Sequence, residues 1–340
     1  ELGLHRDHQL ANVIDPGVDI FFSAHTHELT PAPLSSKSGA IVVEAGNDAY
    51  LGNMVVTLSD GVASDFSWEV LAVDESLEQD PEMLLLVTQA RAPFLGEGVN
   101  FKYPMPGMEW PLTEAIDSAS GHVAVDLHRR NVLENPFNNL LADSMRSYYH
   151  TDIALTPGFR FDTVIPANTE ITLEQLYRYL PVPPELSKGT VSGKNLKLVF
   201  ETELARVFST DAFEHSGGWL MGVSGIDLTL DLSRDKGKRV LAMARSGDMS
   251  EILPDDILTV VSCTRPFDDD DVMCSNPGFA SVEKLPGPDG EHWTPMALLR
   301  HTLQNDLPDN RTQLHFHDNS LTPAWPKSPY LQPLHSQGLH

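Results

Sequence analysis

The chain has 340 residues, of which 41% are hydrophobic and 21% charged, enough for a sizeable buried core and, at roughly 150 residues per domain, for two domains. It carries 23 lysines and arginines against 48 aspartates and glutamates, a formal net charge of −25 with histidine neutral. A surface this acidic repels phosphate backbones and anionic lipid headgroups, which excludes a nucleic-acid partner and peripheral membrane binding. No apolar run approaches the roughly 18 residues of a transmembrane segment, and the start of the chain does not resemble a signal peptide. Because the first residue is Glu1 and not methionine, we expect a processed chain or part of a longer polypeptide.

The first part of the chain is expected to hold one helix followed by strands. Apolar residues share one helical face over 2–13, and Pro16-Gly17 ends that helix. The apolar run 18–23 is typical of a buried strand. It leads into His25 and His27, at the strand end where open α/β sheets bind ligands. Further strands are predicted at 40–44, 53–59 and 66–73.

Residues 74–111 are predicted to be a linker helix and hinge, with the helix at 80–94 and a segment rich in Gly and Pro after it. Residues 112–317 alternate strand and helix patterns and are predicted to form a second domain, and 318–340 a loose tail. The helices expected in the second domain are 135–149, 173–180, 194–207 and 295–305. The strands expected there are 121–127, 152–155, 226–232, 239–244 and 257–263.

Two histidines separated by one residue are the sharpest local feature of the sequence. His25 and His27 directly follow a buried strand, so one loop can present both imidazoles to a two-metal cluster. A pair of surface histidines is the ordinary alternative for this spacing.

The surroundings of this pair resemble the end of the metallophosphoesterase domain of the 5′-nucleotidase and UDP-sugar hydrolase family. Residues 1–28, ELGLHRDHQLANVIDPGVDIFFSAHTHE, are similar to a family pattern of a ligand followed by Gly, a helix containing Leu-Ala, and then GxDxxxxGHTHE, with Ala24 in place of the usual glycine. The resemblance implies that His25 ligates one metal ion and His27 another, and that Glu1 takes the position of a further ligand histidine. It also implies two divalent metal ions, Mn²⁺ or Zn²⁺, as cofactors.

The second half of the chain is similar to the same family in an ordered set of segments. These are the asparagine-led helix and Asp-Ile-Ala strand at 135–155, the turn at 157–160, and the Val-Ser-Gly segments at 191–197 and 222–240. The resemblance implies an α/β (α+β) fold. In it, residues 1–73 are the tail end of a metallophosphoesterase sandwich and residues 112–317 a 5′-nucleotidase-type C-terminal substrate-binding domain.

Arg160 is the predicted ligand for the substrate's phosphate, because the family places an arginine after a glycine-containing turn here. A guanidinium offers paired, charge-assisted hydrogen bonds to an oxyanion. An ion pair with Asp152 or Asp162 is the alternative. Arg129 and Arg130 are weaker candidates, which we expect to be solvated at the end of a strand.

The aromatic side of the site departs from the family, which stacks the base between two phenylalanines. Val182-Pro183 occupies the place of one ring, whereas Phe159 and Phe267 are the aromatic residues predicted to contact substrate. Because stacking contributes about 1–3 kcal/mol per base, we expect nucleoside selection to be weaker or different.

The two cysteines of the chain, Cys263 and Cys274, are predicted to form a disulfide. The loop between them carries four consecutive aspartates, Asp268 to Asp271, whose repulsion splays the loop unless its base is tied. We expect these aspartates to be solvated and not to bind Ca²⁺. The bridge would contribute roughly 2–3 kcal/mol, and two unrelated thiols are the alternative. A disulfide indicates an oxidising compartment, so we expect a periplasmic, secreted or cell-surface protein.

The leading hypothesis is that the chain is the carboxyl-terminal portion of an extracytoplasmic dimetal phosphohydrolase acting on phosphate esters of nucleotides or related small molecules. In the family an amino-terminal Asp-x-His, a bridging Asp and an Asn-His pair come ahead of the histidine pair, and neither an Asp-x-His nor an Asn-His occurs before His25 in the given sequence. We therefore assign no catalytic residue, expect the chain alone to be inactive, and expect a missing amino-terminal part to complete the site. One alternative is a thiosulfohydrolase-like enzyme of sulfur oxidation acting on a carrier protein. The other is a non-catalytic binding or surface-assembly protein on the same scaffold.

Overall fold

The computed structural model describes residues 3–46, 48–74, 76–95, 112, 114–129, 132–158, 163–181, 184–209, 211, 213–215, 220–265, 267–287 and 293–305, together with the backbone of 316–318. None of the helices in these ranges has the length and apolarity of a membrane span.

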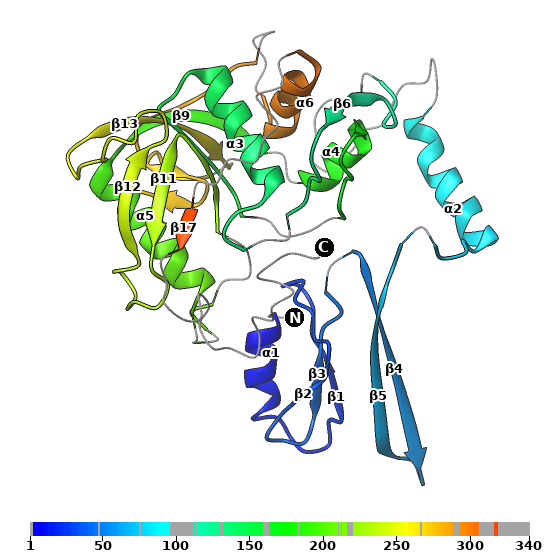
Figure 1. Ribbon diagram of the computed structural model, residues 1–340. Coiled ribbons are helices and arrows are strands. Elements are labelled where there is room, and N and C mark those ends of the chain that lie inside the picture. The colour runs from blue at the N-terminus through cyan, green and yellow to red at the C-terminus, as the bar shows by residue number, and fades with distance from the viewer. Residues whose placement is uncertain are drawn as a thin grey trace.

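The first part of the described chain is a small α/β unit (Figure 1). Its elements are α1 (Leu4–Ala11), β1 (Ile20–Phe22), β2 (Leu34–Ser35) and β3 (Ile41–Val43). The strands form one sheet in the order β1-β3-β2, with β1 parallel to β3 and β2 antiparallel to it. Leu4 and Ala11 of α1 pack on Val42 of β3 to make the buried core of the unit. Because β1 and β3 are parallel, the residues that follow them meet at one edge of the sheet.

A long hairpin and a helix follow this unit and are largely exposed. The elements are β4 (Tyr50–Ser59), β5 (Val62–Ala72), α2 (Pro81–Arg91) and the 3₁₀-helix η1 (Ala92–Phe94). The β4–β5 hairpin extends away from the α/β unit (Figure 1), and Trp68 Nε1 donates to Thr30 O at 2.7 Å where the two meet. Asp80 caps α2 by accepting a hydrogen bond from Met83 N at 2.8 Å.

The second domain is built on a mixed five-stranded sheet in the order β10-β7-β13-β9-β16. In this sheet β7 is parallel to β13, and the remaining pairs are antiparallel. Smaller sheets with the orders β12-β11-β17, β6-β8 and β14-β15 surround it. The helices are α3 (Pro136–Tyr149), α4 (Leu173–Tyr179), α5 (Gly193–Val207) and α6 (Pro295–Asn305). The strands are β6 (Ala119–Val123), β7 (Ile153–Thr156), β8 (Thr169–Thr172), β9 (Glu185–Ser192), β10 (Gly222–Ser224), β11 (Ile226–Leu230), β12 (Val240–Arg245), β13 (Ile257–Thr264), β14 (Val272–Met273), β15 (Asn276–Pro277), β16 (Ala280–Lys284) and β17 (Phe316–Asp318).

The five-stranded sheet is buried on both faces. Ile153 and Leu155 of β7 belong to one buried cluster, which includes the apolar face of α5, whereas Ala154 between them belongs to a second cluster with α3, α4 and α6. Val260 and Val261 of β13 divide in the same way. Alternate residues of β7 and β13 therefore contribute to two cores, which explains why these two strands read as nearly continuous apolar runs.

Most elements predicted from the sequence are present, and the predicted α/β class is confirmed. The expected helices of the second domain correspond to α3, α4, α5 and α6, and the helix expected at 80–94 is divided into α2 and η1. The strand expected at 121–127 ends earlier as β6, and Leu127 instead forms an isolated bridge with Ile165. β9, a central strand, was not predicted because Ser187, Lys188 and Gly189 interrupt its apolar pattern.

The predicted domain limits stay predictions, since much of the proposed linker, 96–111, lies outside the described residues. The loose tail predicted from residue 318 includes one strand residue, because Asp318 pairs with Leu230 of β11.

Candidate functional site

The paired histidines lie on the loop that follows β1, at the edge where β1 and β3 both end. His25 has a φ of 78° and His27 a φ of 55°, so both residues adopt the left-handed conformation. A non-glycine residue in this region costs about 1–3 kcal/mol and persists only where its surroundings hold it. His25 is exposed and His27 is half-buried. The loop therefore exposes the His25 imidazole and keeps that of His27 half-buried, with its Nδ1 inside, on a backbone that the protein fixes.

Thr26, between the two histidines, is the anchor of this loop. Its side chain is 4% exposed, and its Oγ1 accepts a hydrogen bond from Leu4 N at 3.0 Å and donates to the Glu28 carboxylate. Gly3 comes so close to Thr26 that a Cβ at this position would overlap the threonine methyl group. The start of α1 thus packs directly on the loop.

Three buried carboxylates, Asp7, Glu28 and Glu44, form a cluster beneath the loop. Glu44 Oε1 accepts from Glu28 N at 3.0 Å, and Ser23 Oγ donates to Asp7 Oδ2 at 2.7 Å and lies 3.2 Å from Glu44 Oε2. The carboxylate cluster therefore ties the loop to α1 and to the end of β3. Sequence reasoning did not predict this cluster, because its members are far apart in the chain and only the fold brings them together.

His25 and His27 fit as two ligands of a transition-metal centre, because imidazole nitrogens suit Zn²⁺ and related ions. The carboxylate cluster is buried and hydrogen-bonded to the loop, so it supports the histidines instead of adding exposed ligands. Within the described part of the chain, no group of three or more His, Cys, Asp or Glu side chains is arranged to hold an ion. Glu1 lies outside the described residues. The two-metal centre and the roles of His25 and His27 as its ligands therefore stay predictions.

The second predicted region lies at the carboxyl ends of the parallel strands β7 and β13. Thr156 ends β7 and continues into Pro157 and Gly158, whereas Phe159 and Arg160 lie outside the described residues. Their predicted contacts with substrate stay predictions. Val182 and Pro183, at the expected position of a stacking ring, also lie outside the described residues.

The expectation that Arg129 is solvated is wrong, because its side chain is buried. Its side chain is 1% exposed, and its guanidinium carbon lies 4.5 Å from the centroid of the Phe137 ring. Its Nη1 donates to Tyr179 O at 2.5 Å. Stacking on an aromatic face lets a guanidinium enter a core, an option the local sequence does not reveal. Arg130 lies outside the described residues.

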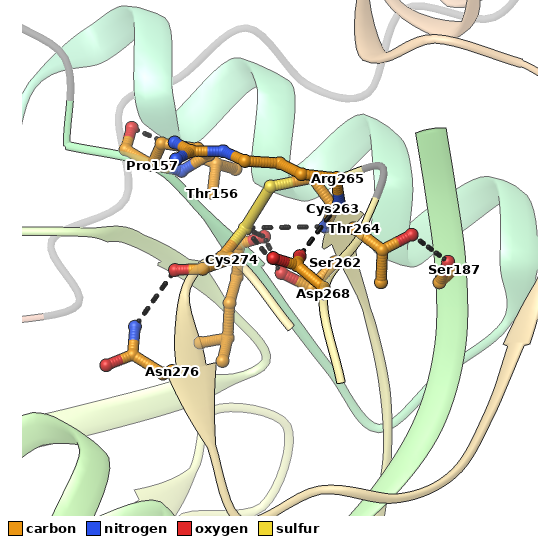
Figure 2. The surroundings of a disulfide bond; sticks show 11 residues. Thr156, Pro157, Ser187, Ser262, Cys263, Thr264, Arg265, Asp268, Cys274 and Asn276 are labelled. Atoms are coloured by element: carbon orange, nitrogen blue, oxygen red, sulfur yellow. Dashed lines mark hydrogen bonds between the residues drawn. A yellow bond between two sulfur atoms is a disulfide. The ribbon is translucent and has the colours of Figure 1, made fainter. Parts of the chain in front are cut away.

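Cys263 and Cys274 form the predicted disulfide, with their Cα atoms 5.0 Å apart (Figure 2). The bridge closes the acidic loop at its base, where Cys274 N also donates to Cys263 O at 2.6 Å. Inside the loop, Asp268 Oδ2 accepts from Arg265 N at 2.8 Å, and the next three aspartates are exposed, as expected.

Phe267 lies at the exposed tip of this loop. Its φ is 74°, in the left-handed region, and its side chain is fully exposed. A large ring that is fully exposed has a face available for stacking. Its predicted role in substrate binding stays a prediction.

His5 of α1 is a titratable group that the sequence did not single out. It is 4% exposed, and its ring centroid lies 5.5 Å from that of His215 in the second domain. Burial lowers the pKa of His5 from 6.5 to about 4, the nearby Asp211 opposes this shift, and His8 and Arg6 add to it. His5 is therefore neutral at pH 7 and lies in the contact between α1 and residues 211–215.

A shallow groove of about 420 Å³ runs along α5 and contains none of the predicted site residues. Leu198 and Ala205 line it, and an ion pair between Lys236 and Glu214, 2.9 Å long, lies at its edge. Its lining is mostly apolar, so it does not resemble a phosphate site.

Residues 117–264 match the family "5′-nucleotidase, C-terminal domain". The resemblance inferred from the sequence is confirmed for this part of the chain, which contains the five-stranded sheet and the strand ends described above.

The chain is also similar to particular proteins. The chain is 26% identical over 257 residues to the endonuclease YhcR of Bacillus subtilis strain 168, an alignment covering 74% of this chain and 18% of YhcR. Its fold is similar to that of the sulfate thiohydrolase SoxB of Thermus thermophilus, solved with glycerol, with a TM-score of 0.73 and 20% identity over 97% of this chain and 54% of SoxB. It is also similar to a 5′-nucleotidase precursor from Thermus thermophilus, with a TM-score of 0.67 and 20% identity over 94% of this chain and 63% of that protein. The chain thus spans less than two thirds of the length of each of these proteins, and at 20% identity the two solved structures show the fold alone.

Proposed function

We propose that the protein is a metal-dependent phosphohydrolase of the 5′-nucleotidase type, acting on phosphate esters of nucleotides or related small molecules. The observation that carries the proposal is the loop of His25 and His27, held in the left-handed conformation at the carboxyl end of β1. It occurs in a chain whose residues 117–264 match the 5′-nucleotidase C-terminal domain.

In this proposal His25 and His27 would each ligate one of two divalent ions, Mn²⁺ or Zn²⁺. When bound, such a pair supplies Lewis-acid activation of water and stabilises the charge of phosphoryl transfer. The chain's own contribution is preorganisation. The carboxylate cluster and Thr26 fix the loop before any ion arrives, so little loop entropy is lost on binding.

Substrate binding is proposed for the strand ends of the second domain. Arg160, in the turn after β7, would hold the oxyanion, and Phe159 and Phe267 would contact the organic part of the substrate. Support for Phe267 comes from its exposed ring and from the disulfide that fixes the base of its loop. The net charge of −25 favours a small substrate over a polynucleotide, because long polyanions are repelled more strongly.

We further propose an extracytoplasmic location, periplasmic, secreted or at the cell surface. The support is the disulfide between Cys263 and Cys274, since such bonds persist mainly in oxidising compartments.

The test uses the protein expressed from its native gene. Elemental analysis should find about two transition-metal ions per chain, and phosphate release should be seen with nucleoside monophosphates or UDP-sugars. A His25→Ala, His27→Ala double variant should lose both metal and activity. His122→Ala, at an exposed position of β6, is the matched control and should lose neither.

Each other result has a definite meaning. A double variant with full metal content and full activity would refute the metal assignment. A metal-free wild-type protein without hydrolase activity would instead favour a binding or surface-assembly protein. Turnover of a thiosulfate-loaded carrier protein, but of no phosphate ester, would favour the thiosulfohydrolase alternative.

A further inference from the structure

Asn138 in the first turn of α3 is a buried amide without a hydrogen-bond partner among the described residues. Its residue is 1% exposed, and neither Oδ1 nor Nδ2 makes a hydrogen bond there. Its neighbours differ: Asn135 caps the helix through Asn138 N at 2.9 Å, and Asn139 Nδ2 donates to Glu134 at 2.8 Å. Because buried polar groups are nearly always paired, this amide calls for a partner from outside the described chain.

The amide lies beside the carboxyl end of β7. The point that a Cβ on Gly222 would occupy is 2.6 Å from Asn138 Cβ and 3.0 Å from Thr156 Oγ1. Gly222 of β10 therefore lets α3 pack closely on β10 and β7, and Asn138 lies beside the Thr156 hydroxyl. Thr156 is 1% exposed, and among the described residues its Oγ1 makes only a long hydrogen bond of 3.4 Å to Pro157 O. Ligands of open α/β sheets bind at such strand ends.

The groups that meet at this strand end are mainly donors. Asn138 Nδ2 carries two N–H groups beside one unpaired acceptor, Oδ1, and the start of α3 adds a partial positive charge. The Thr156 hydroxyl becomes a third donor when it gives up its long hydrogen bond to Pro157 O. The Arg265 side chain follows the neighbouring strand β13 and extends toward Thr156 and Pro157 (Figure 2). Within the described residues its guanidinium forms no ion pair, although Asp268 accepts from its backbone N–H. Donors and one cation suit an oxyanion.

We propose that Asn138, with Thr156 and Arg265, hydrogen-bonds the phosphoryl oxygens of the substrate, and that Asn138 is a specificity-determining residue for this group. The identity of the ligand as a phosphate ester rests on the proposed function. Since neither amide atom is exposed in this conformation, binding requires a local opening at the strand end.

Three variants test the subsite, with Asn53→Asp on the exposed hairpin as a control. Inorganic phosphate and adenosine monophosphate are titrated by calorimetry in chelator-containing buffer, where binding needs neither metal nor turnover. Asn138→Leu removes an unpaired amide, so it should raise the Tm of the ligand-free protein. It should also lower the affinity for both ligands at least tenfold. Asn138→Asp adds a negative charge at the same volume and should weaken them further. Arg265→Gln should also lower the affinity for both ligands about tenfold, whereas Asn53→Asp should leave the affinity and the Tm unchanged.

The opposite results are equally definite. Unchanged affinity in Asn138→Leu, or no binding of either ligand to the wild type, overturns the subsite. A lowered Tm with unchanged affinity would show that the amide holds a structural water. Hydrolysis assays with added metal distinguish the two proposals. Binding through Asn138 without any hydrolysis keeps the subsite and removes the proposed function, whereas hydrolysis that is insensitive to Asn138 removes the subsite alone.

Discussion

The contact between α1 and the second domain should depend on pH through His5. The His5 ring is buried against His215, and Arg6 Nη2 donates to Phe213 O at 3.3 Å and to His215 O at 3.5 Å. Protonated His5 would be a buried cation beside Arg6, with Asp211 as the nearby opposing charge. Neutral His5 is therefore the form that suits this contact.

The direction in which the free energy of unfolding changes with pH follows from the two pKa values of His5. The pKa is about 6.5 in the unfolded chain and about 4 in the folded protein. As pH falls below 6.5, the unfolded chain binds a proton that the folded protein does not, so the free energy of unfolding decreases. The loss continues until pH 4, where both states are protonated. At 1.36 kcal/mol per pKa unit it reaches about 2.5 kcal/mol at pH 4.5.

Urea unfolding at pH 7.5 and pH 4.5 measures this effect, with His5→Gln as the non-titrating variant. The wild type should lose about 2.5 kcal/mol more than His5→Gln between the two pH values, and hydrogen exchange should locate the loss at residues 4–11 and 211–215. His122→Gln, at an exposed position, should follow the wild type. Parallel pH profiles for the wild type and His5→Gln would refute the reasoning.

Three further outcomes are expected. Replacing both Cys263 and Cys274 by serine should lower the free energy of unfolding by about 3 kcal/mol in urea, from the entropy of an open loop, and an unchanged midpoint would show that the bond contributes nothing. Gly225→Ala should cost more than about 2 kcal/mol, because its φ is 83° and a Cβ would overlap a backbone carbonyl, whereas Gly247→Ala, with open space around it, should be neutral in the same thermal melt. In the protein expressed from its native gene, Glu44→Ala should weaken metal binding by about 10–100-fold, because the histidine loop loses the hydrogen bond that supports it. Equilibrium dialysis measures this affinity, and an unchanged value would argue against preorganisation of the loop.

The sequence predicts the second domain well where local and global signals agree. Asn135 and Pro136 mark the start of α3, and the structure shows Asn135 as the cap. The apolar strands β7 and β13 are likewise evident, because both of their faces are buried. β9 is different: its pairing with β13 and β16 is set by backbone hydrogen bonds across long sequence distances, which a run such as Ser187-Lys188-Gly189 does not reveal.

For the candidate site, the sequence indicates which residues to consider but not how the fold holds them. The spacing of His25 and His27 and the strand before them are readable locally. The local sequence does not reveal their left-handed backbone or the burial of Thr26 between them, because both features depend on contacts with distant residues. Asn138 gave no signal either, since an asparagine near a helix start usually reads as a cap or a surface residue.

The geometry of the histidine loop favours a functional pair over two incidental surface histidines. Two left-handed histidines cost about 1–3 kcal/mol each, and a solvated loop would relax to avoid that cost. Here the backbone is held by Thr26 and Glu28, which are hydrogen-bonded to one another and to Glu44 in the protein interior. Each such bond contributes only about 0.5–1.5 kcal/mol net, so several are needed to offset the strain, and burying carboxylates adds a further cost. A loop that is stabilised mainly by polar contacts, with the His25 ring exposed and the His27 ring half-buried with its Nδ1 inside, gains little from packing. Metal binding would provide a reason for this arrangement.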